Sequence, residues 1–286
     1  MKAKLVRILA GIAMVVGFSA FPVSAQWLNF RNPNIPRTPD GKPNLSAHAP
    51  RTSDGKPDLS GIWRVPTLRS ANIIYAYNIA QDLTSENVLP WAEAVYEERL
   101  KEFGKELPSI TCRVPNSVPL YATGFFPSKI VQTSSLIVVM YEDNGNPYRQ
   151  VFMDGRALPG DPDLPAWLGY SVGHWEGDAL VVETSGFNNK SWLDAQGHPQ
   201  TEKLRLTERY RRRDFGHLEL QLTIDDPGAY KKPWTVSYEQ QLLTDTDILE
   251  SFCENERDRA HLIGRVETQK EIFLPTAFNV SPRRRC

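Results

Sequence analysis

A single carboxylate lies in an otherwise apolar row of a predicted β-hairpin. We expect strands over 204–213 and 217–224, where alternation puts Glu208 in one row with Leu204, Leu206, Tyr210, Leu218, Leu220 and Leu222. Burial in such a row raises the pKa of a carboxyl group towards neutrality, which suits a general acid or base. The alternative is a buried ion pair with a nearby arginine, such as Arg209 or Arg211 turned inward.

The preceding hairpin offers a second set of groups for proton transfer. It spans 170–184 around a turn at Glu176-Gly177, and alternation places Tyr170, His174 and Glu183 on one side of the sheet. A tyrosine, a histidine and a carboxylate on one face could move protons and orient a substrate. The alternative is a solvated outer face, with Tyr170 directly opposite Glu183 in an ordinary cross-strand contact.

Two further histidines lie in or beside turns. His198 belongs to a loop marked by glycine and proline, where Asp194 is close enough in sequence to orient its ring; the alternative is a surface turn. His217 begins a strand and could close the turn before it. The histidine spacing does not require a metal site, and we expect none. The candidate catalytic residues are therefore His174, Asp194, His198, Glu208 and His217.

Substrate binding is assigned to side chains of the same two hairpins, namely Tyr170, Glu183, Arg209 and Tyr210. The basic run over 209–213 is interrupted by acidic residues, so it indicates a salt-bridged strand that could also bind an anionic group. The Gly-x-Ser-x-Gly pattern around Ser171 lies inside a strand rather than at a strand–helix turn, so we interpret Ser171 as structural. The sequence has no phosphate-binding glycine loop or dinucleotide fingerprint, and we expect no cofactor.

The elements that must position these groups are mainly strands. Runs of β-branched and aromatic residues alternate with turn residues, and the expected strands beyond the two hairpins lie at 129–141, 148–153, 234–243 and 248–253, the last two as a pair. Successive strands joined by tight turns predict an antiparallel meander. A meander of this length closes into a barrel or a sandwich, because open strand edges promote aggregation.

One peripheral helix is expected near residues 89–103. Ser85 can cap it and Pro90 suits its first turn. Its apolar residues recur at near-helical spacing, which predicts a buried face made of Trp91, Val95, Leu100 and Phe103.

Residues 1–25 are typical of a cleavable signal peptide. A short basic stretch precedes an uncharged apolar run, and Val23-Ser-Ala25 offers the small residues of a cleavage site. The mature chain is expected to begin at Gln26, in the periplasm or outside the cell. Its net charge of about −4 argues against nucleic acid as a partner. No later stretch predicts a membrane span, and the sequence indicates no oligomeric state.

Three segments are expected after the signal peptide. Residues 26–58 form a proline-rich, extended arm with a short duplication, in which Arg37–Ser46 is echoed by Arg51–Ser60, each with an Asp-Gly turn. Residues 59–275 form the β-barrel domain, and residues 276–286 form a basic tail. The arm is expected to wrap the domain or to space it from another molecule.

The three cysteines suit an exported chain. Cys112 and Cys253 are expected to form one disulfide that closes a long loop, and the alternative is two buried free thiols. Cys286 ends the basic tail and is expected to be unpaired. The sequence has no paired Cys/His spacing of the kind that structural zinc sites use.

Two resemblances bear on fold and location. Leu59-Ser-Gly-Ile-Trp63 resembles the Gly-x-Trp element that opens the first strand of lipocalin-like (calycin) barrels, which implies such a barrel. The chain is also similar to a large group of uncharacterised exported bacterial proteins, in the segments Asp54–Trp63, Gly169–Asp178 and Thr223–Pro227. That similarity supports export and the domain limits, and it implies no settled activity.

Two functions remain open from the sequence. The first is an enzyme that holds a small, largely apolar or aromatic molecule and moves protons without a cofactor, as a lyase, isomerase or hydrolase; the titratable groups at strand ends and loops favour it. The second is a lipocalin-like binding or carrier protein, and a third, weaker one is an interaction protein that docks through the arm. Convergence of Glu208 with the histidines favours the enzyme, whereas an arginine partner far from them removes Glu208 from the catalytic set.

Overall fold

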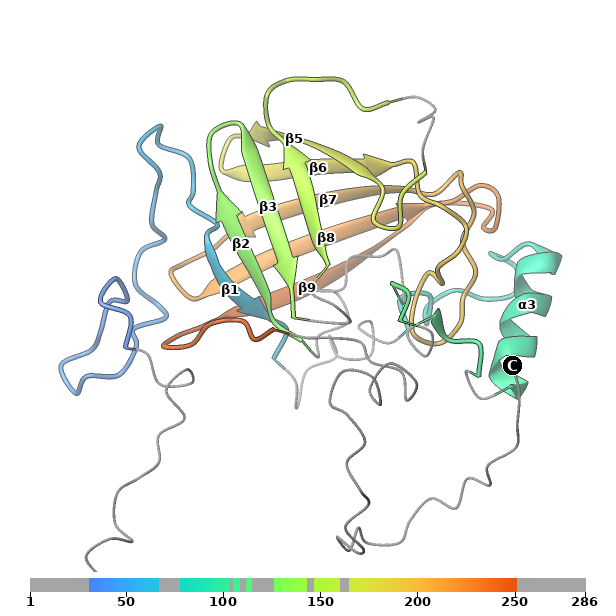
Figure 1. Cartoon of the computed structure of the whole chain (residues 1–286), viewed down its shortest axis with the longest axis horizontal. Coiled ribbons are helices and arrows are strands. Elements are labelled where there is room, and N and C mark those ends of the chain that lie inside the picture. Colours follow the sequence, from blue (N-terminus) through green and yellow to red (C-terminus); the bar gives the residue numbers. More distant parts are fainter. Residues whose placement is uncertain are drawn as a thin grey trace, which may run out of the picture. The chain divides into compact units, whose positions relative to one another are not determined.

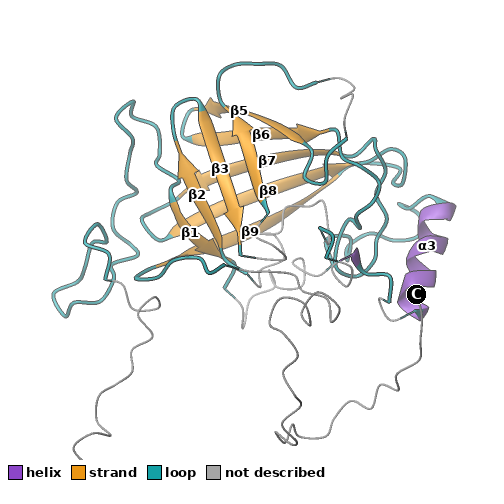
Figure 2. Cartoon of the chain, viewed as in Figure 1, coloured by secondary structure: helices purple, strands orange, loops and turns teal. Residues whose placement is uncertain are grey.

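The computed structural model describes residues 31–66, 78–102, 105–108, 112–114, 126–142, 147–159 and 165–250. Within this part of the chain the fold is mainly β, with nine strands and a single short helix (Figures 1 and 2). The strands are β1 (Gly61–Arg64), β2 (Ser128–Gln132), β3 (Leu136–Tyr141), β4 (Tyr148–Phe152), β5 (Tyr170–Glu176), β6 (Ala179–Ser185), β7 (Arg205–Arg212), β8 (His217–Asp225) and β9 (Trp234–Leu243). The helix is α3 (Pro90–Lys101).

The strands form one closed barrel in chain order. Each strand pairs with the next, and β9 pairs back with β1 through Ile62–Leu243 and Trp63–Leu242. Closure gives each of these strands a neighbour on both sides, so none of them forms an open edge of the sheet. The predicted mainly β barrel is therefore confirmed, and it is consistent with a lipocalin-like barrel.

The predicted strand pair at 234–243 and 248–253 is wrong. β9 has β8 on one side and β1 on the other, so no edge of β9 is left for another strand. Residues 248–250 belong to no strand, and residues 251–253 lie outside the described part of the chain. β9 therefore pairs with β1 instead of with a strand at 248–253.

The junction between β4 and β5, called the seam below, departs from the predicted antiparallel meander. β4 and β5 run parallel and pair only through Val151–Ser171 and Phe152–Val172. Parallel neighbours cannot be joined by a tight turn, and the long connection over 153–169 meets that requirement. Every other pair of neighbouring strands is antiparallel.

The predicted strand register is correct for one of the two hairpins and shifted for the other. Between β7 and β8 the predicted pairing is confirmed, with Glu208 opposite Leu222. Between β5 and β6 the register is shifted by two residues from the prediction, so Tyr170 lies opposite Ser185 instead of Glu183. The cause is the turn, which is made by Gly177-Asp178, with Gly177 at φ +60°. A shift of two residues leaves the faces unchanged, so the predicted sides of this hairpin are correct.

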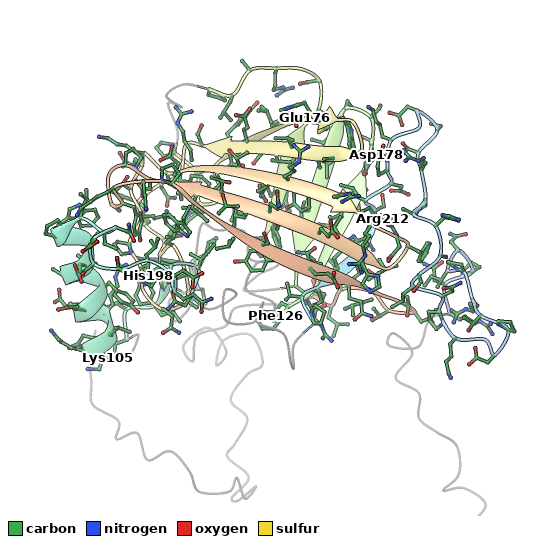
Figure 3. The ribbon with its side chains drawn as sticks, turned by 180° about the vertical axis from the view of Figure 1, so that it is seen from behind. Lys105, Phe126, Glu176, Asp178, His198 and Arg212 are labelled. Atoms are coloured by element: carbon green, nitrogen blue, oxygen red, sulfur yellow. The ribbon has the colours of Figure 1, made fainter. Side chains whose placement is uncertain are left out.

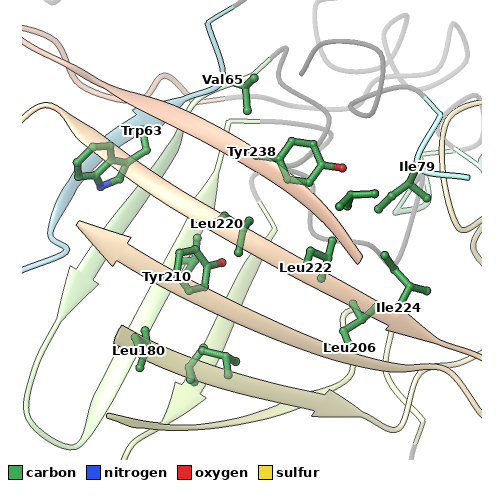
Figure 4. Packing of buried hydrophobic residues seen from close by; sticks show 14 of the residues in the cluster. Trp63, Val65, Ile79, Leu180, Leu206, Tyr210, Leu220, Leu222, Ile224 and Tyr238 are labelled. Atoms are coloured by element: carbon green, nitrogen blue, oxygen red, sulfur yellow. The ribbon is translucent and has the colours of Figure 1, made fainter. Parts of the chain in front are cut away.

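The barrel core follows directly from strand alternation. Along β7 exposed and buried residues alternate without a break, and β8 buries a row of aliphatic side chains, Leu218, Leu220, Leu222 and Ile224. Figure 4 shows Leu220, Leu222 and Ile224 in the buried cluster that also contains Trp63, Leu180 and Tyr238. Burial of each such side chain contributes about 1.5–3 kcal/mol to stability.

The helix α3 is present, although its cap and its buried face differ from the predictions. Its N-cap is Leu89, with no side-chain cap, so Ser85 does not cap it, whereas Pro90 does occupy the first turn. Trp91 and Leu100 are exposed, and the helix buries Ala92 instead. The contact face is formed by the residues that follow Ala92 at helical spacing, Tyr96 and Arg99, which touch the loop over residues 192–198. Tertiary contacts therefore override the apolar pattern of this helix.

The duplicated arm forms two copies of one turn. In the first copy Thr38 N–H donates to the Lys42 carbonyl at 2.9 Å, and the corresponding bond in the second copy, from Thr52 to Lys56, has the same length. Each copy begins with an arginine that forms an ion pair with an aspartate of a different barrel loop. Arg37 lies 2.5 Å from Asp245, and Arg51 lies 2.6 Å from Asp178. The arm thus wraps one end of the barrel.

A stacked arginine seals this end of the barrel. Arg212 faces inward from β7, and its guanidinium lies 5.0 Å from the ring of Trp63 and 5.2 Å from that of Phe215. It donates to the backbone carbonyls of Asp58, Asp214 and Phe215. Burial lowers the pKa of Arg212 to about 10. One side chain thus joins the arm, the β7–β8 turn and the Gly-x-Trp strand.

Several predictions concern residues outside the described part of the chain. These are the signal peptide at 1–25, the tail at 276–286, Cys253 and Cys286. The Cys112–Cys253 disulfide therefore stays a prediction. Among the described residues, no helix has the length and apolar character needed to cross a bilayer.

We predict that Arg212→Lys lowers the free energy of unfolding by about 2–3 kcal/mol, because an ammonium group cannot hold three carbonyls and stack between two rings. Urea denaturation measures the loss. The matched control is Arg211→Lys, at the preceding residue. The Arg211 side chain faces solvent, so its replacement should change the free energy of unfolding by less than about 0.5 kcal/mol. Equal stability of the two variants would contradict the assignment.

Candidate functional site

The carboxylate of Glu208 forms a buried ion pair inside the barrel. Glu208 is 0% exposed, and one of its oxygens is in direct contact with the guanidinium of Arg149 on β4. Its other oxygen accepts a 2.8 Å hydrogen bond from the hydroxyl of Tyr210. Of the two alternatives left open by the sequence, the structure thus shows an ion pair. The expected partners were wrong, because Arg209 and Arg211 face outward.

Arg149 extends this pair across the parallel seam. Its Nε donates to the hydroxyl of Ser171 on β5 at 2.9 Å, and its Nη2 lies 3.4 Å from the hydroxyl of Thr184 on β6. The two hydroxyls are 2.9 Å apart and hydrogen-bonded to each other. One polar network therefore links β4, β5, β6 and β7, in a region of the barrel where backbone pairing is sparse.

Burial controls the electrostatics of this network. Desolvation raises the pKa of the Glu208 carboxyl to about 8, while the hydrogen bond from Tyr210 works in the opposite direction. Burial also raises the pKa of the Tyr141 hydroxyl on β3, to about 12, and raises that of Tyr210. The tyrosines therefore stay protonated, and Glu208 is the group of this set that exchanges a proton near neutral pH.

An open cleft lies on the outer side of the network. It has a volume of about 520 Å³, a size typical of small-molecule sites. Its walls come from β4, from the start of β5 and from the chain before β5, and they are rich in apolar and aromatic side chains: Tyr148, Phe152, Trp167, Leu168 and Tyr170. The two buried polar residues that line it are Arg149 and Ser171.

The barrel interior behind Arg149 is nearly filled. Arg149 and Tyr210, with aliphatic neighbours such as Val151 and Val182, enclose a cavity of about 10 Å³. That is the space of a single water molecule at most. A small organic molecule fits the outer cleft and does not fit this cavity.

The structure does not bring the predicted catalytic residues together. His174 points outward from β5, about half exposed, with its Nε2 3.4 Å from Glu176. His217 lies at the start of β8, where its Nδ1 is 2.6 Å from Asp214. Both are separated from Glu208, which points inward from β7.

His198 and Asp194 do form the predicted pair, in a different place. The Nδ1 of His198 is 2.7 Å from Asp194, and its ring stacks on that of Tyr96 of α3 with centroids 3.9 Å apart. Figure 3 shows His198 on the side of the barrel where α3 lies. Asp194 also accepts hydrogen bonds from three backbone N–H groups, those of Ile79, Gln196 and His198. This set of contacts joins a loop, the helix and residue 79. Its geometry is that of a structural anchor.

The predicted substrate-binding residues divide between two locations. Tyr170 lines the cleft, and Tyr210 belongs to the network behind it. Glu183 is exposed on the outer face of β6, and Arg209 pairs with Glu176 at 2.5 Å on the surface. The latter two therefore lie outside the cleft.

The sequence analysis missed Arg149 and underestimated Ser171. A signal for Arg149 was present, because alternation in the predicted strand at 148–153 puts it in one row with Val151, where a charge needs a partner. Glu208 was the matching carboxylate on a distant strand. Ser171 was correctly placed within a strand, where its hydroxyl serves the polar network.

Comparisons with family models, with curated proteins and with solved structures found no match to the chain, so its function is inferred from the site itself. Among the described residues, no three His, Cys, Asp or Glu side chains lie close enough together to hold a metal ion.

We predict strong coupling between Arg149 and Glu208. Arg149→Met or Glu208→Met should each lower the free energy of unfolding by about 3–5 kcal/mol, because each leaves one buried charge without its counter-charge. The double variant should lose far less than the sum of the two. A double-mutant cycle by urea denaturation measures this, with the exposed Glu202→Met as control. Additive losses would refute the coupling.

We predict that Asp194→Asn lowers the free energy of unfolding by about 2–4 kcal/mol, since an amide nitrogen would face N–H donors in place of a carboxylate oxygen. His198→Phe should be milder, because the ring can still stack on Tyr96. Thermal or urea unfolding of both variants provides the measurement. A purely catalytic role for Asp194 predicts no loss of stability.

Proposed function

We propose that this protein binds a small, largely apolar or aromatic molecule in the cleft beside β4 and β5. The observation that carries the proposal is the composition of the cleft, whose lining combines aromatic and apolar side chains with two buried polar residues, Arg149 and Ser171. Binding sites for small molecules typically have this form, with many apolar contacts and few polar groups that set orientation.

The aromatic wall has the features of a binding surface. Tyr148 is 63% exposed, which is unusual for a large side chain in a β-strand, and covering it with a ligand would remove apolar area from water. Beside it, Phe152 stacks against Tyr170 with ring centroids 5.1 Å apart, and the Arg156 guanidinium lies 3.9 Å from the Phe152 ring. Flat aromatic ligands can stack on such a surface.

Binding is favoured over turnover by the position of the titratable groups. A cofactor-free lyase or isomerase needs a proton donor or acceptor at the ligand. Asp194, His198 and His217 do not line the cleft, and neither does His174. Glu208 lies behind Arg149 and is held by it. The function therefore proposed is that of a non-catalytic binding or carrier protein.

We further propose that binding takes place outside the cytoplasm, in the periplasm or the medium. The support is the sequence of residues 1–25, which is that expected of a cleavable signal peptide. The mature net charge of about −4 fits a neutral or apolar ligand better than nucleic acid.

The proposal predicts saturable binding of N-phenyl-1-naphthylamine, a neutral aromatic probe whose fluorescence rises in apolar sites. Tyr148→Ala should raise its Kd about five- to tenfold, because an aromatic contact contributes about 1 kcal/mol beyond its buried area. Fluorescence titration measures the Kd.

The control for this test is Phe126→Ala, which removes another exposed aromatic side chain, 48% exposed, that does not line the cleft. Its Kd should equal that of the unaltered protein. The proposal fails if the probe does not saturate, or if both variants weaken binding equally.

A further inference from the structure

Arg149 separates the cleft from the barrel interior. It lines the open cleft on one side and the small internal cavity on the other. Its carboxylate partner, Glu208, approaches from the interior, on the opposite side of the barrel wall from any molecule in the cleft. Of the two charged residues of the network, Arg149 is thus the one that lines the cleft.

The strands that hold Arg149 are joined by the shortest ladder in the barrel. β4 and β5 pair only at Val151–Ser171 and Phe152–Val172, and Arg149 lies before the first of these pairs. Its bonds to β5 are made by its side chain, through Ser171. Small movements of the seam therefore cost fewer backbone hydrogen bonds here than at the other strand pairs.

Three strands bring charged or titratable side chains to the network around Glu208. β3 contributes Tyr141, β4 contributes Arg149, and β7 contributes Tyr210. Of the described residues on β5, β6 and β8, those in the same layer are uncharged: Ser171, Val182, Thr184 and Leu222. Arg212 lies further along β7 and is held by backbone carbonyls at the end of the barrel. One cation and one titratable carboxylate therefore set the local charge.

We propose that the ligand of the cleft carries an anionic group, such as a carboxylate, which binds Arg149, and that Glu208 is in its protonated form whenever the ligand is bound. The inference rests on the proposed function and specifies its ligand class. Two anions on one buried guanidinium would leave an uncompensated negative charge in a low-dielectric site. Protonation of Glu208 removes that charge.

The proton balance is simple. Above about pH 8, where Glu208 is ionised, the site before binding holds the Arg149 cation and the Glu208 carboxylate. After binding it holds the Arg149 cation, the ligand anion and a neutral Glu208 carboxylic acid, with one proton taken from solvent and no covalent bond made or broken among heavy atoms. The Tyr210 hydroxyl stays hydrogen-bonded to Glu208 in either state. Since burial raises the pKa of Glu208 to about 8, the carboxyl already carries this proton well below that pH, and binding there takes up none.

The experiment compares two probes of the same shape, 2-naphthoate and its neutral analogue 2-naphthamide, between about pH 6 and 9, where the naphthoate stays ionised. For the naphthoate we expect a constant Kd at low pH that rises above about pH 8, with a limiting slope of about tenfold per pH unit. For the amide we expect no pH dependence. Calorimetry in two buffers with different ionisation enthalpies should show uptake of about one proton per naphthoate at about pH 9, and close to none at about pH 6.

Glu208→Gln provides the decisive variant, because glutamine keeps a hydrogen-bond acceptor but cannot titrate. It should bind naphthoate with a Kd that does not change with pH. The matched control is the exposed Glu202→Gln, which should keep the pH dependence of the unaltered protein. If Glu208→Gln does not fold, the proton uptake of the unaltered protein still decides the question.

The outcomes distinguish this inference from the proposed function. If neither probe binds, the proposed function fails and the inference falls with it. If both probes bind with no pH dependence and no proton uptake, the binding function stands and the inference is overturned. The same holds if the pH dependence persists in Glu208→Gln.

Discussion

The buried contact between Arg149 and Glu208 is the interaction on which the barrel wall depends. It joins β4 to β7 across a region where β4 and β5 share few backbone hydrogen bonds. Ser171 and Thr184 complete the network, so side chains supply the cohesion that a longer ladder would otherwise provide. A buried ion pair contributes little net stability by comparison with an apolar pair, but the loss of either partner is severe.

The same seam explains why a cleft exists at this place. The antiparallel strands β7 and β8 pair at eight positions, whereas the parallel strands β4 and β5 pair at only two. The chain over 153–169 has to travel back before β5 can begin, and its described part supplies Trp167 and Leu168 to the cleft wall. Parallel strands need a long connection, and here that connection forms part of the concave surface. Arg149 adds a charged residue to the lining.

The two ends of the barrel are secured by different means. At one end the duplicated turns and Arg212 hold the arm against the β7–β8 turn, where Gly216 lies so close to Leu45 that a Cβ atom would be 2.4 Å away. Elsewhere Asp194 and His198 connect a loop to α3. Residues whose types suggest catalysis therefore serve as anchors, because buried polar groups must be hydrogen-bonded wherever they occur.

Local patterns determined much of this protein. Alternation placed Glu208 in the core row, assigned the faces of both hairpins and set the β7–β8 register, because those features depend on neighbouring residues and short turns. Only the tertiary structure decided the partner of Glu208, the parallel seam and the buried face of α3. Those depend on contacts between residues far apart in the chain, and no local spacing states that a strand beginning at Tyr148 will lie within reach of β7.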